Sequence, residues 1–186
     1  MAIANAGGIE PLVALARGGT DGHKQWAARA LRNLAVNTDN RVAIARAGGI
    51  GALVALARGG TELQMEYAAW ALWNLALDTE CQGVIAKEGG VDALVALVAG
   101  GTNAQKENAA AALASLAVNN DVKLVIAEAG GVKALVALAR GGPFSGRASG
   151  RRGGTDAQTQ WAARALTVLA GSAKIKLAIV KAGYKL

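Results

Sequence analysis

Pairs of adjacent glycines recur along this chain at a fixed interval of 41 residues. One set of pairs lies at 7–8, 48–49, 89–90 and 130–131, and a second set lies at 18–19, 59–60, 100–101 and 141–142. The sequence Leu-Val-Ala-Leu stands between the two sets in all four units. Self-similarity with a period of 20–50 residues is the signature of repeat architectures. The chain is therefore predicted to be a tandem array.

Each repeat is predicted to contain three helices. The second repeat divides into a short helix over 38–47, a second helix over 50–58 and a third over 61–77. Alanine, the strongest helix former, is concentrated in the third segment, and the chain holds only two prolines. The second helix is expected to end at Gly59-Gly60, with glycine in the left-handed conformation.

The third helices carry a start signal in their first turn. Thr61 is followed three residues later by Gln64, and the pairs at 102/105 and 155/158 have the same spacing. A threonine N-cap with glutamine at the third helical position forms a capping box. We therefore predict that these three helices begin with reciprocal side-chain caps.

Composition and charge exclude several classes of protein. Hydrophobic residues make up 53% of the chain, which is incompatible with intrinsic disorder. The net charge of +7 arises in residues 143–186, where eight basic residues face Asp156 as the single acidic one. Nucleic acid or an anionic membrane is a lower-ranked partner for this basic end.

The residues needed for catalysis or metal binding are missing. His23 and Cys81 are the single histidine and the single cysteine, so a zinc site or a Cys–His pair cannot be built. We predict no enzyme, no cofactor, no metal and no small-molecule substrate. With neither a secretory signal nor an uninterrupted apolar span, the chain is expected to be intracellular, either cytoplasmic or nuclear.

Two segments resemble a known repeat family. Residues 40–56, with Ile-Ala-Arg-Ala-Gly-Gly-Ile at 44–50, are similar to the first and second helices of the armadillo repeat, and residues 69–76 are similar to its third. The resemblance implies an all-α fold, a right-handed α-solenoid of about four three-helix armadillo repeats of the importin α and β-catenin type. It also implies that the third helices line a concave groove that binds an extended peptide or protein segment.

On this basis residues 1–186 are expected to form a single armadillo-repeat domain. The predicted repeats are 1–37, 38–78, 79–119 and 120–171, followed by a partial fifth repeat at 172–186. The fourth repeat carries an insert at 143–154, rich in Gly, Ser and Arg. We interpret this insert as a tolerated loop extension, and a basic finger that contacts an acidic partner is the alternative.

The outer face of the third helix can be read from helical geometry alone. At 3.6 residues per turn, positions 27, 28, 30, 31, 34 and 35 of the first repeat form one apolar stripe. Positions 22, 25, 26, 29, 32, 33 and 36 form the opposite arc, which should face solvent. All four tryptophans of the chain, at 26, 70, 73 and 161, fall on that arc together with Tyr67. Aligned exposed aromatics indicate an interaction surface, the alternative being that they pack partly against neighbours and bind nothing.

The groove motif of the armadillo family is Trp followed four residues later by Asn. Trp70 and Asn74 match it fully, and Arg29 with Asn33 matches it by half. The asparagine amides are expected to bind the ligand backbone and the indoles to hold ligand side chains. The predicted groove residues are Trp26, Arg29, Asn33, Tyr67, Trp70, Asn74, Asn108, Ser115, Trp161 and Arg164.

A second function stays open on the sequence. Neither end of the chain shows a polar capping repeat, and the C-terminal region is basic. The alternative to peptide binding is therefore a structural subunit that docks through its ends and its basic C-terminal region. Its partners would be further copies of itself or neighbouring subunits of a larger complex.

Overall fold

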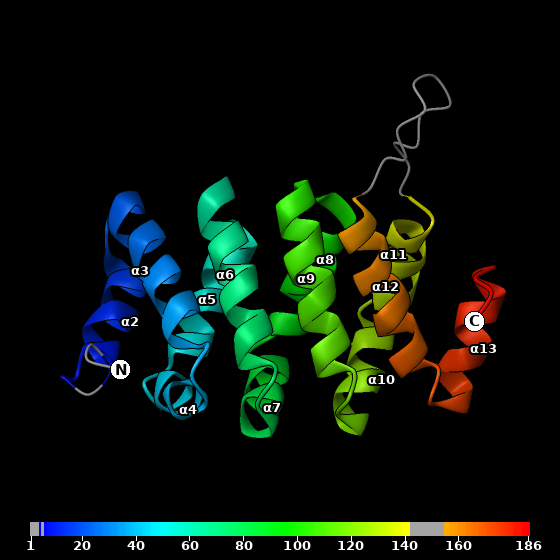
Figure 1. Ribbon diagram of the computed structural model, residues 1–186, viewed down its shortest axis with the longest axis horizontal. Coiled ribbons are helices and arrows are strands. Elements are labelled where there is room, and N and C mark those ends of the chain that lie inside the picture. The colour runs from blue at the N-terminus through cyan, green and yellow to red at the C-terminus, as the bar shows by residue number, and fades with distance from the viewer. Residues whose placement is uncertain (1–3, 5, 142–154) are drawn as a thin grey trace, which may run out of the picture. The chain divides into compact units, whose positions relative to one another are not determined.

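The computed structural model describes residues 4, 6–141 and 155–186, and within these ranges it contains twelve α-helices and no strand (Figure 1). The first six helices are α2 (Ile9–Gly18), α3 (Asp21–Leu34), α4 (Thr38–Arg46), α5 (Gly49–Gly59), α6 (Glu62–Leu75) and α7 (Thr79–Lys87). The others are α8 (Gly90–Gly100), α9 (Asn103–Leu116), α10 (Asn120–Glu128), α11 (Gly131–Ala139), α12 (Asp156–Leu169) and α13 (Ala173–Lys181). The insert at 143–154 lies outside the described residues.

The helices follow the predicted order of short, second and third within each repeat. Helices α4, α5 and α6 occupy the three segments expected for the second repeat, within two residues at each boundary. The chain divides into two compact units, Met1–Ala93 and Leu94–Leu186. In the first unit the third helices α3 and α6 pack against each other, and in the second unit α9 packs against α12.

Small side chains on the third helices make this packing close. Ala27, Ala28 and Leu31 of α3 are buried, as the predicted apolar stripe requires. On α6, Ala68 and Leu72 are completely buried. A methyl side chain keeps the distance between two packed helices short, so the alanine-rich core determines how near neighbouring third helices lie.

The glycine corners differ from the prediction. In the first set of pairs Gly7, Gly48, Gly89 and Gly130 are left-handed, with φ between +73° and +79°, whereas in the second set Gly141 is left-handed, with φ +92°. Gly60, expected to be left-handed, is extended with φ −77° and ψ 177°. The reason for glycine there is a close approach, because a Cβ at Gly60 would lie 2.6 Å from the carbonyl oxygen of Leu56.

The three predicted capping boxes are confirmed, and two of their glutamines have a second role. Thr61, Thr102 and Thr155 each cap their own helix reciprocally with the glutamine three residues later. The Gln64 side-chain nitrogen also donates to the Asp21 carbonyl at 2.9 Å, at the start of α3. In the second unit Gln158 donates in the same way to the Asn103 carbonyl at 2.6 Å. Gln64 and Gln158 thus each join two successive third helices at their N-terminal ends.

Among the described helices, none is by itself both long and apolar enough to span a membrane. Taken together, helices α4 and α5 have the length and composition of such a span, but the chain bends by 82° between them.

Candidate binding face on the third helices

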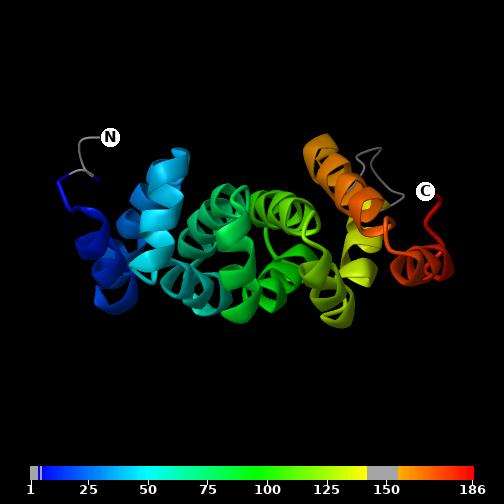
Figure 2. The same ribbon diagram turned by 90° about the horizontal axis from the view of Figure 1, so that it is seen from below.

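The outer faces of α3 and α6 lie side by side in the first unit, and the pair can be followed in Figure 1 and from below in Figure 2. Trp26 is 58% exposed, and Arg29 and Asn33 on the same face are also exposed. Tyr67, Trp70 and Asn74 of α6 are half-buried. The structure therefore brings six predicted site residues onto one continuous face, which we call the α3/α6 face.

Arginine side chains cover the aromatic rings of this face. The Arg29 guanidinium carbon lies 5.2 Å from the Trp26 ring centroid. Arg32 of α3 reaches the neighbouring helix, where it lies 4.3 Å from the Trp70 ring and 5.5 Å from the Tyr67 ring. These distances are within the range of cation–π attraction. The indoles of Trp26 and Trp70 are therefore already paired with cations of the chain itself, a pairing that the sequence analysis did not include.

Arg32 makes hydrogen bonds through both its side chain and its backbone. Its Nε and Nη2 atoms donate to the Asn33 side-chain oxygen at 3.0 and 2.7 Å. The Arg32 backbone carbonyl accepts a hydrogen bond from the Asn74 side-chain nitrogen at 3.0 Å. This carbonyl lies in the last turn of α3, where no intrahelical donor remains. Asn74 therefore links α3 to α6 and has its amide plane oriented by that link.

The sequence analysis placed position 32 on the outer arc but did not include Arg32 among the site residues. Its partners Tyr67 and Trp70 follow it by 35 and 38 residues, on another helix. A one-helix projection cannot reveal such a pair, because the side chain extends across to the next repeat. The available signal was a long cationic side chain on the outer arc, one repeat before an aromatic cluster.

In the second unit the outer arc of α9 is less accessible than predicted. Asn108 is 7% exposed and Ala111 is completely buried. The side chain of Ala111 is a single methyl group close to the helix backbone, so longer side chains around it readily cover it. Ser115 is half-buried, and its hydroxyl donates to the Ala111 carbonyl at 3.1 Å within α9.

Helix α12 repeats the arrangement of α3. The Arg164 guanidinium carbon lies 5.4 Å from the Trp161 ring centroid, the same three-residue spacing as Trp26 and Arg29. Arg164 is exposed and Trp161 is half-buried. The outer arc of α12 therefore presents a guanidinium backed by an indole, as α3 does.

Cys81 is a buried thiol on α7. Burial, together with the neighbouring Asp78 carboxylate, raises the pKa of Cys81 to about 12. Its sulfur donates to the Arg41 carbonyl at 3.6 Å, on the preceding short helix α4. The thiol is therefore protonated at neutral pH and packs between repeats. Among the described side chains, no group of three or more His, Cys, Asp or Glu converges.

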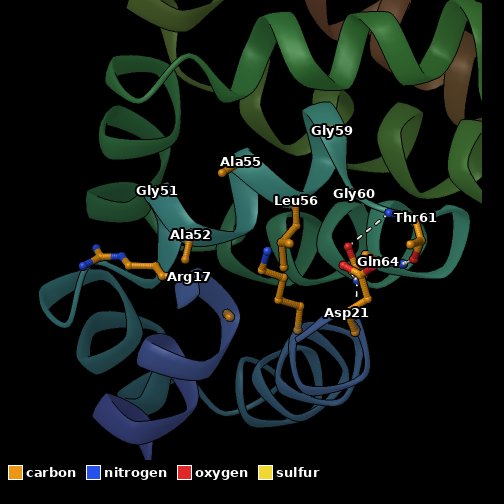
Figure 3. Close-up of a pocket in the computed structure, with 12 residues that line it drawn as sticks. Arg17, Asp21, Gly51, Ala52, Ala55, Leu56, Gly59, Gly60, Thr61 and Gln64 are labelled. Atoms are coloured by element: carbon orange, nitrogen blue, oxygen red, sulfur yellow. Dashed lines mark hydrogen bonds between the residues drawn. The ribbon is translucent and has the colours of Figure 1, made fainter. Parts of the chain in front are cut away.

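A second feature of the first unit is a cavity of about 520 Å³, which is lined by α2 and α5 and by the N-terminal ends of α3 and α6 (Figure 3). Arg17 stands at one side of this cavity, and Asp21 with Gln64 stands at the other. Cationic, anionic and amide groups therefore share its lining. We call it the α2/α5 cavity.

Comparison with known proteins agrees with this geometry. Residues 37–77 match the Armadillo/beta-catenin-like repeat family. One similar solved structure is an engineered protein with 34% sequence identity and a TM-score of 0.86 over 98% of this chain, which spans 42% of that protein's length. A second engineered protein has 31% identity and a TM-score of 0.82, with 94% of this chain and 68% of that one aligned.

A third similar structure is a designed armadillo repeat protein in complex with the peptide (KR)4. It shares 26% identity and a TM-score of 0.83 over 97% of this chain and 72% of its own. No curated protein matches the chain at a significant level. The three-helix repeats, the family match and these structures define an all-α solenoid. The chain belongs to the armadillo-repeat family.

Proposed function

We propose that this chain is a protein-interaction module, which binds an extended peptide or protein segment along the outer faces of its third helices. We further propose that the α3/α6 face prefers an acidic segment. The observation that carries the proposal is the seating of Arg29 and Arg32 over the indoles of Trp26 and Trp70. A guanidinium held on an aromatic platform offers a pre-positioned donor fork to a ligand carboxylate.

The dimensions of the repeat suit an extended ligand. Packed helices are separated by about 8–10 Å, whereas an extended chain advances about 3.3–3.6 Å per residue. Each third helix can therefore contact two or three ligand residues. Alternate side chains of such a ligand point to the same side, which would place one acidic side chain against each Arg–Trp pair.

The charge of the face differs from what a basic ligand requires. The related designed protein was solved with a Lys-Arg peptide. Here Arg29 and Arg32 both stand on the outer arc of α3, and the Arg32 guanidinium reaches across to the aromatic rings of α6. A cationic ligand would have to displace an arginine from each ring, and like charges in contact are repulsive. An acidic ligand would instead be attracted to the guanidinium groups of both Arg29 and Arg32.

The test is a comparison of two labelled eight-residue peptides, one alternating Glu and Leu and the other alternating Lys and Leu. The Glu peptide is expected to bind at least tenfold more tightly by fluorescence anisotropy, about 1.4 kcal/mol. Its affinity should fall as salt concentration rises. Equal affinity, or preference for the Lys peptide, would contradict the acidic preference. Failure of both peptides to bind would contradict the groove itself.

A second candidate function is assembly through α13, and a separate observation favours it. Leu177 and Val180 are 55% and 54% exposed on this helix, and Lys174, Lys176 and Lys181 are exposed beside them. Large apolar side chains three residues apart form one surface stripe of a helix, which is a common form of docking surface. We propose that this stripe can dock on a second copy or a neighbouring subunit.

The assembly proposal predicts concentration-dependent self-association. Light scattering should show a molar mass that increases with protein concentration, and Leu177→Glu should return the chain to a monomer because it places a charge in the apolar contact. The control is Lys87→Glu, which makes a lysine-to-glutamate change at an exposed position on α7, outside the apolar stripe of α13. A wild-type chain that stays monomeric at high concentration would refute self-docking.

A further inference from the structure

A recurring arginine joins successive repeats on the side of the molecule formed by the second helices. The Arg17 guanidinium donates to the Gly48 carbonyl at 2.8 Å, and Arg58 donates to the Gly89 carbonyl at 2.8 Å. Arg140 donates in the same way to the Gly183 carbonyl. All three acceptors are left-handed glycines at the corner before the next repeat. The arginine therefore closes the gap between one second helix and the following corner.

One corner lacks this arginine. In the third repeat the equivalent residue is Ala99, and the corner glycine is Gly130. A Cβ at Gly48, Gly89 or Gly183 would meet the arginine guanidinium, whereas a Cβ at Gly130 would meet no atom within 4 Å. The space that a guanidinium occupies at the other three corners is open here.

A cavity of about 370 Å³ lies at this corner, between α8 and α11 of the second unit. We call it the α8/α11 cavity. Its apolar lining comes from Val95, Val98, Ala99, Ala134, Ala137 and Leu138. The volume is within the range of small-molecule sites. An apolar lining favours a hydrocarbon or aromatic body in the cavity.

Charge decides which kind of apolar ligand would fit. Among the described residues that line the α8/α11 cavity, Lys106 and Lys133 are the charged ones and none carries a carboxylate. The α2/α5 cavity instead combines Arg17 and Lys24 with Asp21, so its charges are partly balanced. Two ammonium groups beside an apolar pocket attract a ligand with one anionic end and repel a cationic one.

We infer that the α8/α11 cavity is a binding site for a small amphiphilic anion, such as a medium-chain carboxylate. Its apolar chain would lie against the alanine and valine side chains, and its carboxylate would face Lys106 and Lys133. The site is independent of the α3/α6 face, because none of its lining residues belongs to α3 or α6.

The test uses decanoate and decylamine, which share an apolar chain and differ in the charge of the head group. Amide chemical shifts of Ala99, Gly130 and Ala134 should move on titration with decanoate, and its Kd should be at least tenfold lower than that of decylamine. Lys133→Glu should abolish the preference between the two ligands, because it leaves Lys106 beside one carboxylate, and the apolar lining stays intact since Lys133 is exposed. Ala134→Leu should weaken decanoate at least tenfold by filling the cavity.

The matched control is Lys176→Glu on α13, which removes an exposed lysine that does not line the cavity and should leave both affinities unchanged. Thermal unfolding of each variant shows whether it is folded before its affinity is compared. Equal binding of decanoate and decylamine to the wild type would overturn the inference. Shift changes spread over the whole surface, or decanoate affinity untouched by both Lys133→Glu and Ala134→Leu, would overturn it as well.

Discussion

Replacing Gly131 with alanine is expected to lower the free energy of unfolding by about 3 kcal/mol, the upper end of what overpacking costs. A Cβ at this position would lie 2.6 Å from the Ile126 carbonyl oxygen and 2.6 Å from its Cγ2 atom, with Val95 Cγ2 at 3.3 Å. The carbonyl belongs to the helical backbone of α10, so it cannot move aside as a flexible side chain could. Urea denaturation followed by circular dichroism measures the effect.

Gly100→Ala is the control for this substitution. Gly100 belongs to another glycine pair of the same unit, and a Cβ there would meet no atom within 4 Å. It is the last residue of α8, where alanine has the higher helix propensity. The control is expected to be neutral or to stabilise by about 0.5–1 kcal/mol. Equal destabilisation by both substitutions would show that the close approach at Gly131 is not the cause.

Replacing Trp70 with alanine is expected to weaken binding of the Glu-Leu peptide at least tenfold, about 1.4 kcal/mol. The substitution removes a direct contact surface and also the ring that holds the Arg32 guanidinium 4.3 Å from its centroid. An unsupported arginine would lose orientation, and fixing it again on binding costs side-chain entropy. Trp70→Phe retains an aromatic platform and should lose less affinity than Trp70→Ala.

Leu15→Ala is the matched control for the loss of an apolar side chain in the first unit. Leu15 is 40% exposed and lies on the second helix α2, not on a third helix. Its replacement should leave peptide affinity unchanged. Thermal unfolding must show that Trp70→Ala is folded at the temperature of the assay. Wild-type affinity in the folded Trp70→Ala protein would exclude the α3/α6 face as the binding site.

The confirmed sequence predictions concern local structure. The helices, their order in the repeat and the three capping boxes could be predicted because each depends on residues within a few positions of one another. Helical periodicity also predicted which face of α3 is buried. The match with the armadillo family model covers one such three-helix unit, residues 37–77.

The glycine pairs show where local reasoning stops. Gly48, Gly60 and Gly131 all stand in Gly-Gly pairs, yet the first has a left-handed backbone and the other two are required by nearby atoms. A pair of glycines signals a corner, but the sequence does not distinguish a constraint on φ from a constraint on space. The positions of the Leu56 and Ile126 carbonyls in the folded chain show that lack of space, and not the φ angle, requires glycine at Gly60 and Gly131.

The chain's repeat architecture, its helices and the alignment of its aromatic residues were determined by the sequence alone, because propensity and periodicity act over a few residues. Tertiary structure decided that Arg32 covers Trp70, that Asn108 is buried and that an apolar cavity lies beside Ala99. The arginine contact, like the cavity, brings together side chains more than 30 residues apart in the sequence. Such contacts depend on how one repeat packs on the next, which no single repeat encodes.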